Sequence, residues 1–137
     1  MYANGIGVPN DDAKAVEWYQ KSAAQGDAAA QFYLGLMYAD GRGVPNDDAK
    51  AVEWWQKCAA QGVACAQSKL GWMYGEGRGV PKDEAKAYAW FNIAAVNNDS
   101  DAIKSREKLE KTMTLEQKDA AQKLSRELFG KIKKPQE

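Results

Sequence analysis

Two stretches in the middle of the chain place apolar side chains at helical spacing. Residues 28–39 carry Ala30, Leu34 and Tyr38 four positions apart, and this pattern predicts an amphipathic helix. Residues 48–61 predict a second helix in the same way. Its expected buried positions follow i, i+3, i+4, i+7 spacing and are Ala51, Trp54, Trp55 and Cys58.

The segment between these helices has the residues of a helix end followed by a helix start. Gly41 supplies the left-handed conformation that commonly ends a helix, and Pro45 holds Val44 in an extended conformation. The next three residues are typical of a helix cap and first turn, and they are Asn46, Asp47 and Asp48. The unit is therefore predicted to consist of a helix A, a turn and a helix B.

The whole unit recurs at an offset of 36 residues. Residues 1–25 match residues 37–61 at 21 of 25 positions, and residues 73–97 match residues 37–61 at 13 of 25. A fixed period of this size predicts stacked helical units, none of which buries its apolar face alone. We therefore expect an all-α fold, a right-handed α/α superhelical solenoid of helix-turn-helix repeats with period 36. Gly35 and Gly71, inside successive A helices, are expected where a neighbouring helix packs against the backbone.

The repeat divides the chain into five parts. Residues 1–26 form a partial first repeat, which holds helix B and the end of helix A, and residues 27–62 and 63–98 form two full repeats. Residues 99–130 are expected to be C-terminal capping helices, because a solenoid needs polar ends. Residues 131–137 are expected to be a frayed tail.

The last helix has a recognisable start. Thr114 followed three residues later by Gln117 forms a capping box, and the helix is expected to run to about Phe129. Its apolar side is expected to consist of Leu115, Ala121, Leu124, Leu128 and Phe129.

Helix B of the first repeat, with Trp18 and Tyr19, lacks most of a helix A before it in the sequence. Three explanations stay open: a truncated chain, a start placed inside a longer reading frame, or a unit completed by another molecule. Truncation is the favoured interpretation, because an unpaired apolar surface of this kind invites association. Self-association through the incomplete N-terminal repeat stays open for the same reason.

Composition and charge exclude several classes of function. The chain has 19 Lys and Arg, 19 Asp and Glu and no His, so it lacks the basic footprint of a nucleic-acid-binding protein. Without histidine it has no Ser-His-Asp or Cys-His catalytic site and no His-ligated metal. No stretch approaches about 18 consecutive apolar residues, as a membrane span requires. No basic segment followed by an apolar run marks a signal peptide. We expect no cofactor and no metal.

The repeat resembles that of the Sel-one-like repeat family of bacterial type, a relative of the tetratricopeptide repeats. The residues that carry the resemblance are Leu34, Gly35, Tyr38, Gly41, Gly43, Val44, Asp47, Lys50, Ala51 and Trp54, with counterparts 36 residues later. It covers about residues 1–97. The resemblance implies a non-catalytic protein-binding scaffold or adaptor. It also implies the bacterial periplasm or cell envelope if a signal peptide has been removed, and otherwise the cytoplasm.

The same kinship implies that the A helices line the concave face and that a partner protein or peptide binds there. Phe32, Leu36 and Trp72 would then form an apolar stripe with charges at its edges, as in interfaces with aromatic anchors inside a polar rim. The alternative is that Trp72 and Phe32 pack in the core. The expected partner-binding residues are Phe32, Leu36, Asp40, Ser68, Trp72, Glu76, Lys104 and Lys108.

Two cysteines are candidates for a disulfide. Cys58, near the end of one helix B, and Cys65, early in the next helix A, flank a tight turn, and an oxidising compartment would allow them to pair. A cysteine-rich branch of the resembled family staples its helices in this way, but in a different register. Two reduced thiols, at least one of them buried, are therefore the favoured interpretation. Two cysteines without a histidine do not make a zinc site.

Two repeated patterns suggest chemistry but have structural explanations. Gly-x-Gly triplets at residues 5–7, 41–43 and 77–79 follow a helix rather than a strand, so turn geometry explains them better than phosphate binding. The acidic pairs at the start of each helix B are attributed to capping and to the helix dipole. An active site would more plausibly occur once than in every repeat.

A third pattern keeps an enzymatic alternative open. Ser105 and Lys108 match the Ser-x-x-Lys pattern of penicillin-binding proteins, and some relatives of the resembled family have been linked to penicillin binding. The companion Ser-Asp-Asn and Lys-Thr-Gly motifs are absent. A weak β-lactam-binding or β-lactam-hydrolysing enzyme is thus the alternative to a scaffold without catalytic residues.

Overall fold

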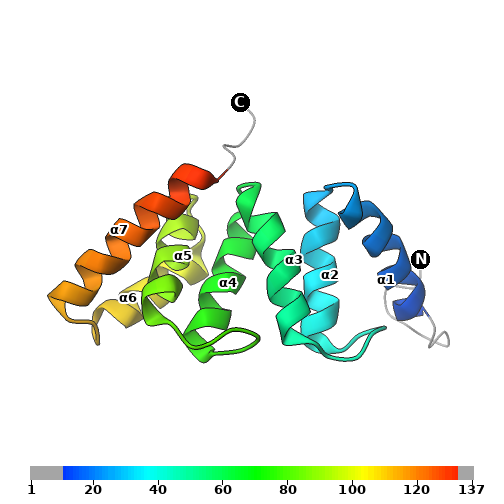
Figure 1. Cartoon of the computed structure of the whole chain (residues 1–137), viewed down its shortest axis with the longest axis horizontal. Coiled ribbons are helices and arrows are strands. Elements are labelled where there is room, and N and C mark those ends of the chain that lie inside the picture. Colours follow the sequence, from blue (N-terminus) through cyan, green and yellow to red (C-terminus); the bar gives the residue numbers. More distant parts are fainter. Residues whose placement is uncertain (1–10, 133–137) are drawn as a thin grey trace.

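Seven α-helices make up the part of the chain that the structure, a computed structural model, describes, which is residues 11–132. They follow one another as a row of packed helices (Figure 1), and no strand occurs between residues 11 and 132. In chain order the helices are α1 (Asp11–Ala24), α2 (Ala28–Asp40), α3 (Asp48–Ala60), α4 (Ala64–Glu76), α5 (Glu84–Val96), α6 (Ser100–Glu110) and α7 (Leu115–Lys131).

Each predicted helix A and helix B pair folds as two packed helices. α2 packs against α3 and α4 packs against α5, and these are the two most extensive helix contacts in the molecule. α3 also packs against α4, which joins the second unit to the third. The last helix, α7, packs back against α5 at one end of the row (Figure 1). None of the seven helices is both long and apolar enough to cross a membrane.

The helix ends use the signals that the sequence predicts. α2 and α4 are followed by Gly41 and Gly77, which have left-handed φ angles of 69° and 70°, a conformation that costs glycine little. α3 and α5 follow Asp47 and Asp83, each of whose carboxylates accepts a hydrogen bond of 3.1 Å from a backbone N–H in the first turn. The predicted capping box of Thr114 is also present at the start of α7.

Glycine lets the A and B helices approach closely, as expected. A Cβ atom at Gly35 would overlap the indole ring of Trp55, and one at Gly71 would overlap the ring of Phe91. The indole Nε1 of Trp55 donates a hydrogen bond of 3.1 Å to the backbone carbonyl of Phe32. These contacts lie at equivalent places in the two units, because Trp55 and Phe91 are 36 residues apart.

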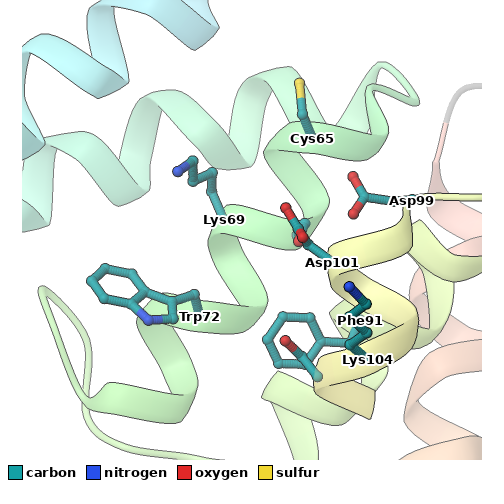
Figure 2. Close-up of a pocket in the computed structure, with 9 residues that line it drawn as sticks. Cys65, Lys69, Trp72, Phe91, Asp99, Asp101 and Lys104 are labelled. Carbon is teal, nitrogen blue, oxygen red and sulfur yellow. The ribbon is translucent and has the colours of Figure 1, made fainter. Parts of the chain in front are cut away.

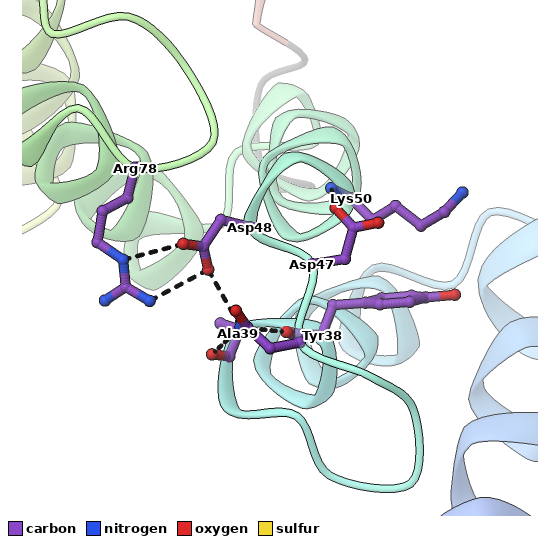
Figure 3. Close-up of polar contacts among 7 residues, drawn as sticks. Tyr38, Ala39, Asp47, Asp48, Lys50 and Arg78 are labelled. Atoms are coloured by element: carbon purple, nitrogen blue, oxygen red, sulfur yellow. Dashed lines mark hydrogen bonds and ion pairs between the residues drawn. The ribbon is translucent and has the colours of Figure 1, made fainter.

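Successive repeats are also joined through the Gly-x-Gly turns, so turn geometry explains these triplets only in part. A Cβ atom at Gly79 would overlap the backbone at the start of α3. Beside it, the guanidinium of Arg78 binds the carboxylate of Asp48 through two hydrogen bonds of 3.1 Å (Figure 3). Arg42 and Asp12 repeat this ion pair one unit earlier at 3.2 Å. Asp12 and Asp48, the second residues of the acidic pairs at 11–12 and 47–48, therefore bind an arginine of the following repeat. Helix capping does not account for this role.

Several buried positions differ from the predictions. Trp54 is only half-buried, and the ammonium of Lys57 lies 4.8 Å from its ring centroid. In α7 the side chains of Leu115 and Phe129 are exposed, because Ala121 and Ser125 form the face that packs against the rest of the protein. Core positions Ala51, Trp55 and Cys58 are buried as predicted.

The ends of the predicted units are only partly described. Lys131 is the last residue of α7 and does not belong to a tail. Ile132 follows as the C-cap of α7. Residues 133–137 of the predicted tail and residues 1–10 of the partial first repeat, including the triplet 5–7, lie outside the described residues.

Candidate functional site

A cleft of about 430 Å³ lies between α4 and α6 (Figure 2). It brings together three of the predicted partner-binding residues, Ser68 and Trp72 on α4 and Lys104 on α6. Its volume falls within the range of about 300–1,000 Å³ that is typical of sites for small ligands and side chains. The remaining lining residues are Cys65, Lys69, Phe91, Asp99, Asp101 and Ser105.

Trp72 is the large exposed aromatic side chain of this cleft. Its side chain is 43% exposed, and the guanidinium carbon of Arg78 lies 4.8 Å from its ring centroid. Because Arg78 is itself held by Asp48, the indole rests on an anchored cation. The hydrogen bonds from Arg78 hold the pKa of Asp48 below its usual range, so the anchor stays ionised at neutral pH.

The floor of the cleft is apolar and its rim is charged. The ring of Phe91, which is buried, closes the bottom. The rim has two carboxylates, from Asp99 and Asp101, and two ammonium groups, from Lys69 and Lys104. Figure 2 shows the two carboxylates on the α6 side, whereas the indole of Trp72 extends from α4 away from α6. Asp99 also caps α6, since it accepts a hydrogen bond of 3.0 Å from the backbone N–H of Ala102.

The structure separates the other members of the predicted apolar stripe from Trp72. Phe32 is half-buried, with its ring centroid 6.4 Å from that of Trp55. Leu36 lines a different hollow of about 510 Å³ between α1 and α2, together with Trp18 and Tyr19. Both Phe32 and Leu36 also pack against the central core. The charged residues Asp40, Glu76, Lys104 and Lys108 are all exposed.

The two cysteines are free thiols in different surroundings. Cys58 is buried, and its thiol lies 3.3 Å from the backbone carbonyl of Ala28, to which it donates a hydrogen bond. Burial, followed by the nearby Cys65 thiol, raises the pKa of Cys58 to about 12. Cys65 is exposed at the start of α4, beside the cleft.

Both residues of the Ser-x-x-Lys pair lie on α6. Ser105 is half-buried at the edge of the cleft, and Lys108 is exposed one helical turn further along α6. No hydrogen bond between these two side chains is present within residues 11–132. Activation of a serine nucleophile needs such contact with a base.

Sequence reasoning missed several residues that line the cleft, among them Phe91 and Asp99. Phe91 forms the floor and Asp99 part of the rim, and neither was among the expected binding residues. A signal was available in the repeat itself, because Ser68 replaces Phe32 at the same repeat position. Replacement of a large ring by a small side chain indicates a place where the stack leaves space.

Comparisons with known proteins agree with this architecture. The Sel1 repeat family model matches residues 1–27, 28–63 and 66–99. The crystal structure of a protective antigen of uropathogenic Escherichia coli strains that displays an SLR fold is similar over 96% of this chain and 28% of that chain, with 38% identity and a TM-score of 0.90. A Sel1 repeat protein from Oxalobacter formigenes is similar over 77% of this chain and 43% of that one, with 39% identity and a TM-score of 0.70. No curated protein matches.

The chain thus spans less than half the length of either structural relative. The similarity to the SLR fold, together with the seven helices, confirms the predicted right-handed α/α solenoid. It also confirms the resemblance to the Sel-one-like repeat family. Sel1 repeats commonly serve as protein-interaction scaffolds and typically have no catalytic role. On the three matched repeats and the shared fold, the chain belongs to the Sel1 repeat family.

Proposed function

We propose that this protein is a non-catalytic scaffold that binds a partner protein or peptide on the concave face formed by α2, α4 and α6. The observation that carries the proposal is Trp72, which is 43% exposed at the mouth of the α4–α6 cleft. A tryptophan held over a cleft by an anchored arginine is the kind of preorganised side chain that dominates binding energy in protein interfaces.

The surroundings of Trp72 fit an interface better than a reaction centre. The apolar floor of Phe91 and the indole lie inside a rim of mixed charge, which is the arrangement of an interface core and rim. Within residues 11–132, no group of three or more Cys, Asp and Glu side chains could hold a metal ion. Asp40, Glu76 and Lys108 extend the exposed polar edge along the same row of helices.

The test compares a partner's affinity for the wild type and for Trp72→Ala. A partner is first captured with the wild-type protein, then purified, and its dissociation constant is measured against each variant. We expect Trp72→Ala to weaken binding at least tenfold, since the truncation of an interface tryptophan often costs roughly 2 kcal/mol or more of binding free energy. Val96→Ala, which removes an exposed apolar side chain at the end of α5, is the matched control and should bind like the wild type.

Circular dichroism separates a binding role from a folding role for Trp72. We expect Trp72→Ala to keep the helical content and cooperative melting of the wild type, because the side chain is largely outside the core. Lys104→Glu, on an exposed rim position, provides a second variant that leaves the core intact. The proposal is refuted if Trp72→Ala, Lys104→Glu and the control Val96→Ala all bind the partner with the affinity of the wild type.

A second surface supports self-association. Trp18 on α1 is 73% exposed, and Tyr19 stacks on Tyr33 with ring centroids 5.6 Å apart beside it. Exposed aromatic surface of this kind favours association. Light scattering across a range of concentrations is expected to show a dimer that Trp18→Ala dissociates, and a strict monomer at all concentrations would contradict this role.

A further inference from the structure

At one position that lines the cleft between α4 and α6, the repeat changes from phenylalanine to serine. Ser68 occupies in the third repeat the position that Phe32 occupies in the second, and Phe91 corresponds in the same way to Trp55. The two units share the close helix contacts at Gly35 and Gly71. The second repeat therefore shows what normally fills this space.

In the second repeat the space is filled by an aromatic ring. The ring of Phe32 lies with its centroid 6.4 Å from that of Trp55, at an interplanar angle of 36°, and it packs against the central core. In the third repeat, Ser68 has no ring to place over Phe91, and the cleft of about 430 Å³ opens at this point. The third repeat thus lacks the aromatic ring that the second repeat places at this position.

The chemistry of the cleft narrows the occupant further. The side chain of Phe91 offers no hydrogen-bonding group at the floor of the cleft. An occupant of the floor is therefore apolar. The two carboxylates and two ammonium groups of the rim balance in charge, so the segment around that side chain does not need a net charge of its own.

We propose that the α4–α6 cleft binds a phenylalanine side chain of a partner peptide, which packs against the small accessible part of Phe91 at the position that Phe32 takes in the preceding repeat. Trp72 also lines the cleft from α4, and its indole extends away from Phe91 (Figure 2). The occupant is an uncharged stretch of peptide around one phenylalanine. This inference rests on the proposed scaffold function and deepens it, because it names the side chain that the scaffold recognises.

The experiment uses two short probes and the full chain. Acetyl-Ala-Phe-Ala-amide and acetyl-Ala-Ala-Ala-amide are titrated into isotope-labelled protein, and amide shifts are followed by NMR. We expect saturable shifts centred on Ser68, Trp72 and Phe91 with the phenylalanine peptide, and an affinity at least tenfold lower for the alanine peptide. Because the charges on the rim are balanced, the affinity should change less than twofold between low and physiological salt.

Two substitutions at one position provide the decisive comparison. Ser68→Phe rebuilds the packing of the second repeat, so it should reduce binding of the phenylalanine peptide to the level of the alanine peptide and raise the melting temperature. Ser68→Ala keeps the cleft open and should bind like the wild type. Ser68→Leu also fills the cleft and should also abolish binding. It serves as the test if Ser68→Phe fails to fold.

The outcomes separate this inference from the scaffold function. If the phenylalanine peptide gives no saturable shifts, shifts residues around Trp18 and Leu36 instead, or binds Ser68→Phe as well as the wild type, the inference is wrong. In that case Trp72→Ala still tests the scaffold function with a whole partner. If the peptide binds as expected but Trp72→Ala leaves the partner's affinity unchanged, the scaffold function on this face is wrong.

Discussion

The guanidinium of Arg78 binds the carboxylate of Asp48 in the preceding repeat and at the same time lies over the ring of Trp72. Its two hydrogen bonds to Asp48 are 3.1 Å long, and its guanidinium carbon is 4.8 Å from the ring centroid of Trp72. One side chain therefore joins two repeats and supports the aromatic group at the cleft. The earlier pair of Arg42 and Asp12 has the first role only, because Leu36 stands at the position of Trp72.

The two ion pairs provide a matched comparison of stability. The side chains of Arg78 and Asp48 are 40% and 23% exposed, whereas those of Arg42 and Asp12 are 54% and 43% exposed. We expect Arg78→Ala to lower the free energy of unfolding by about 1 kcal/mol, from the ion pair and the contact with Trp72. Arg42→Ala should cost about 0.5 kcal/mol or less. Urea unfolding measures both, and a larger loss for Arg42→Ala would contradict the ranking.

The contribution of Asp48 should depend on pH. The folded protein holds the pKa of Asp48 below its usual value of 3.8, chiefly through hydrogen bonds from Arg78. A lowered folded pKa stabilises the protein above the unfolded pKa, and this stabilisation is lost as the pH falls through the folded value. The stability difference between wild type and Asp48→Asn should therefore be constant near neutrality and shrink below a pH of 3.8. Urea midpoints measured across this range would contradict the assignment if the difference grew on acidification.

Glycine substitutions in α4 should have opposite effects at two positions one turn apart. A Cβ atom at Gly71 would lie 2.6 Å from the ring of Phe91, whereas one at Gly75 would lie 3.7 Å from the Cβ of Ala87. Gly71→Ala should destabilise the fold by about 1–3 kcal/mol through overpacking. Gly75→Ala should be neutral or stabilise it by up to about 1 kcal/mol through helix propensity. Thermal and chemical unfolding measure the free energy of unfolding of both variants. An unchanged free energy of unfolding for Gly71→Ala would contradict the prediction, because α4 and α5 would then be able to move apart without loss of stability.

The two thiols should differ in reactivity. Cys65 is exposed, while Cys58 is buried, donates to the carbonyl of Ala28 and has its pKa raised to about 12. The thiolate is the reactive form, so a disulfide reagent should label one thiol in the native protein and two after unfolding. Cys65→Ser should abolish native labelling, and Cys58→Ser should leave it unchanged. Rapid native labelling of Cys65→Ser would show that Cys58 is accessible.

The local structure of the repeat could be predicted because short-range signals carry it. Gly41, Asp47 and the capping box of Thr114 mark helix ends through bonds within a few residues. The period of 36 then requires stacking, since one helix pair cannot bury its own apolar face. A glycine inside a helix indicates a close helix contact, and the backbone at Gly35 does contact Trp55 of the neighbouring helix.

The candidate site could be predicted only in part. The side chain of Trp72 is exposed, as a binding residue must be. Phe32, Leu36 and Trp72 nevertheless do not form one stripe, because Phe32 packs near Trp55 and Leu36 lines the hollow between α1 and α2. Such choices depend on the rotation of each helix against two neighbours. Helical periodicity alone gives the spacing of side chains but not that rotation.

The amino-acid sequence by itself thus determined the repeat, its period, the helix ends and the family, because these depend on local conformation and on recurrence along the chain. The tertiary structure decided which side chains meet. Asp48 reaches Arg78 thirty residues away, and Ser68 on α4 lines a cleft together with Phe91 on α5 and Lys104 on α6. Contacts of this kind are set by how rigid helices pack at their final distances, so the cleft is a property of the stack and not of any single repeat.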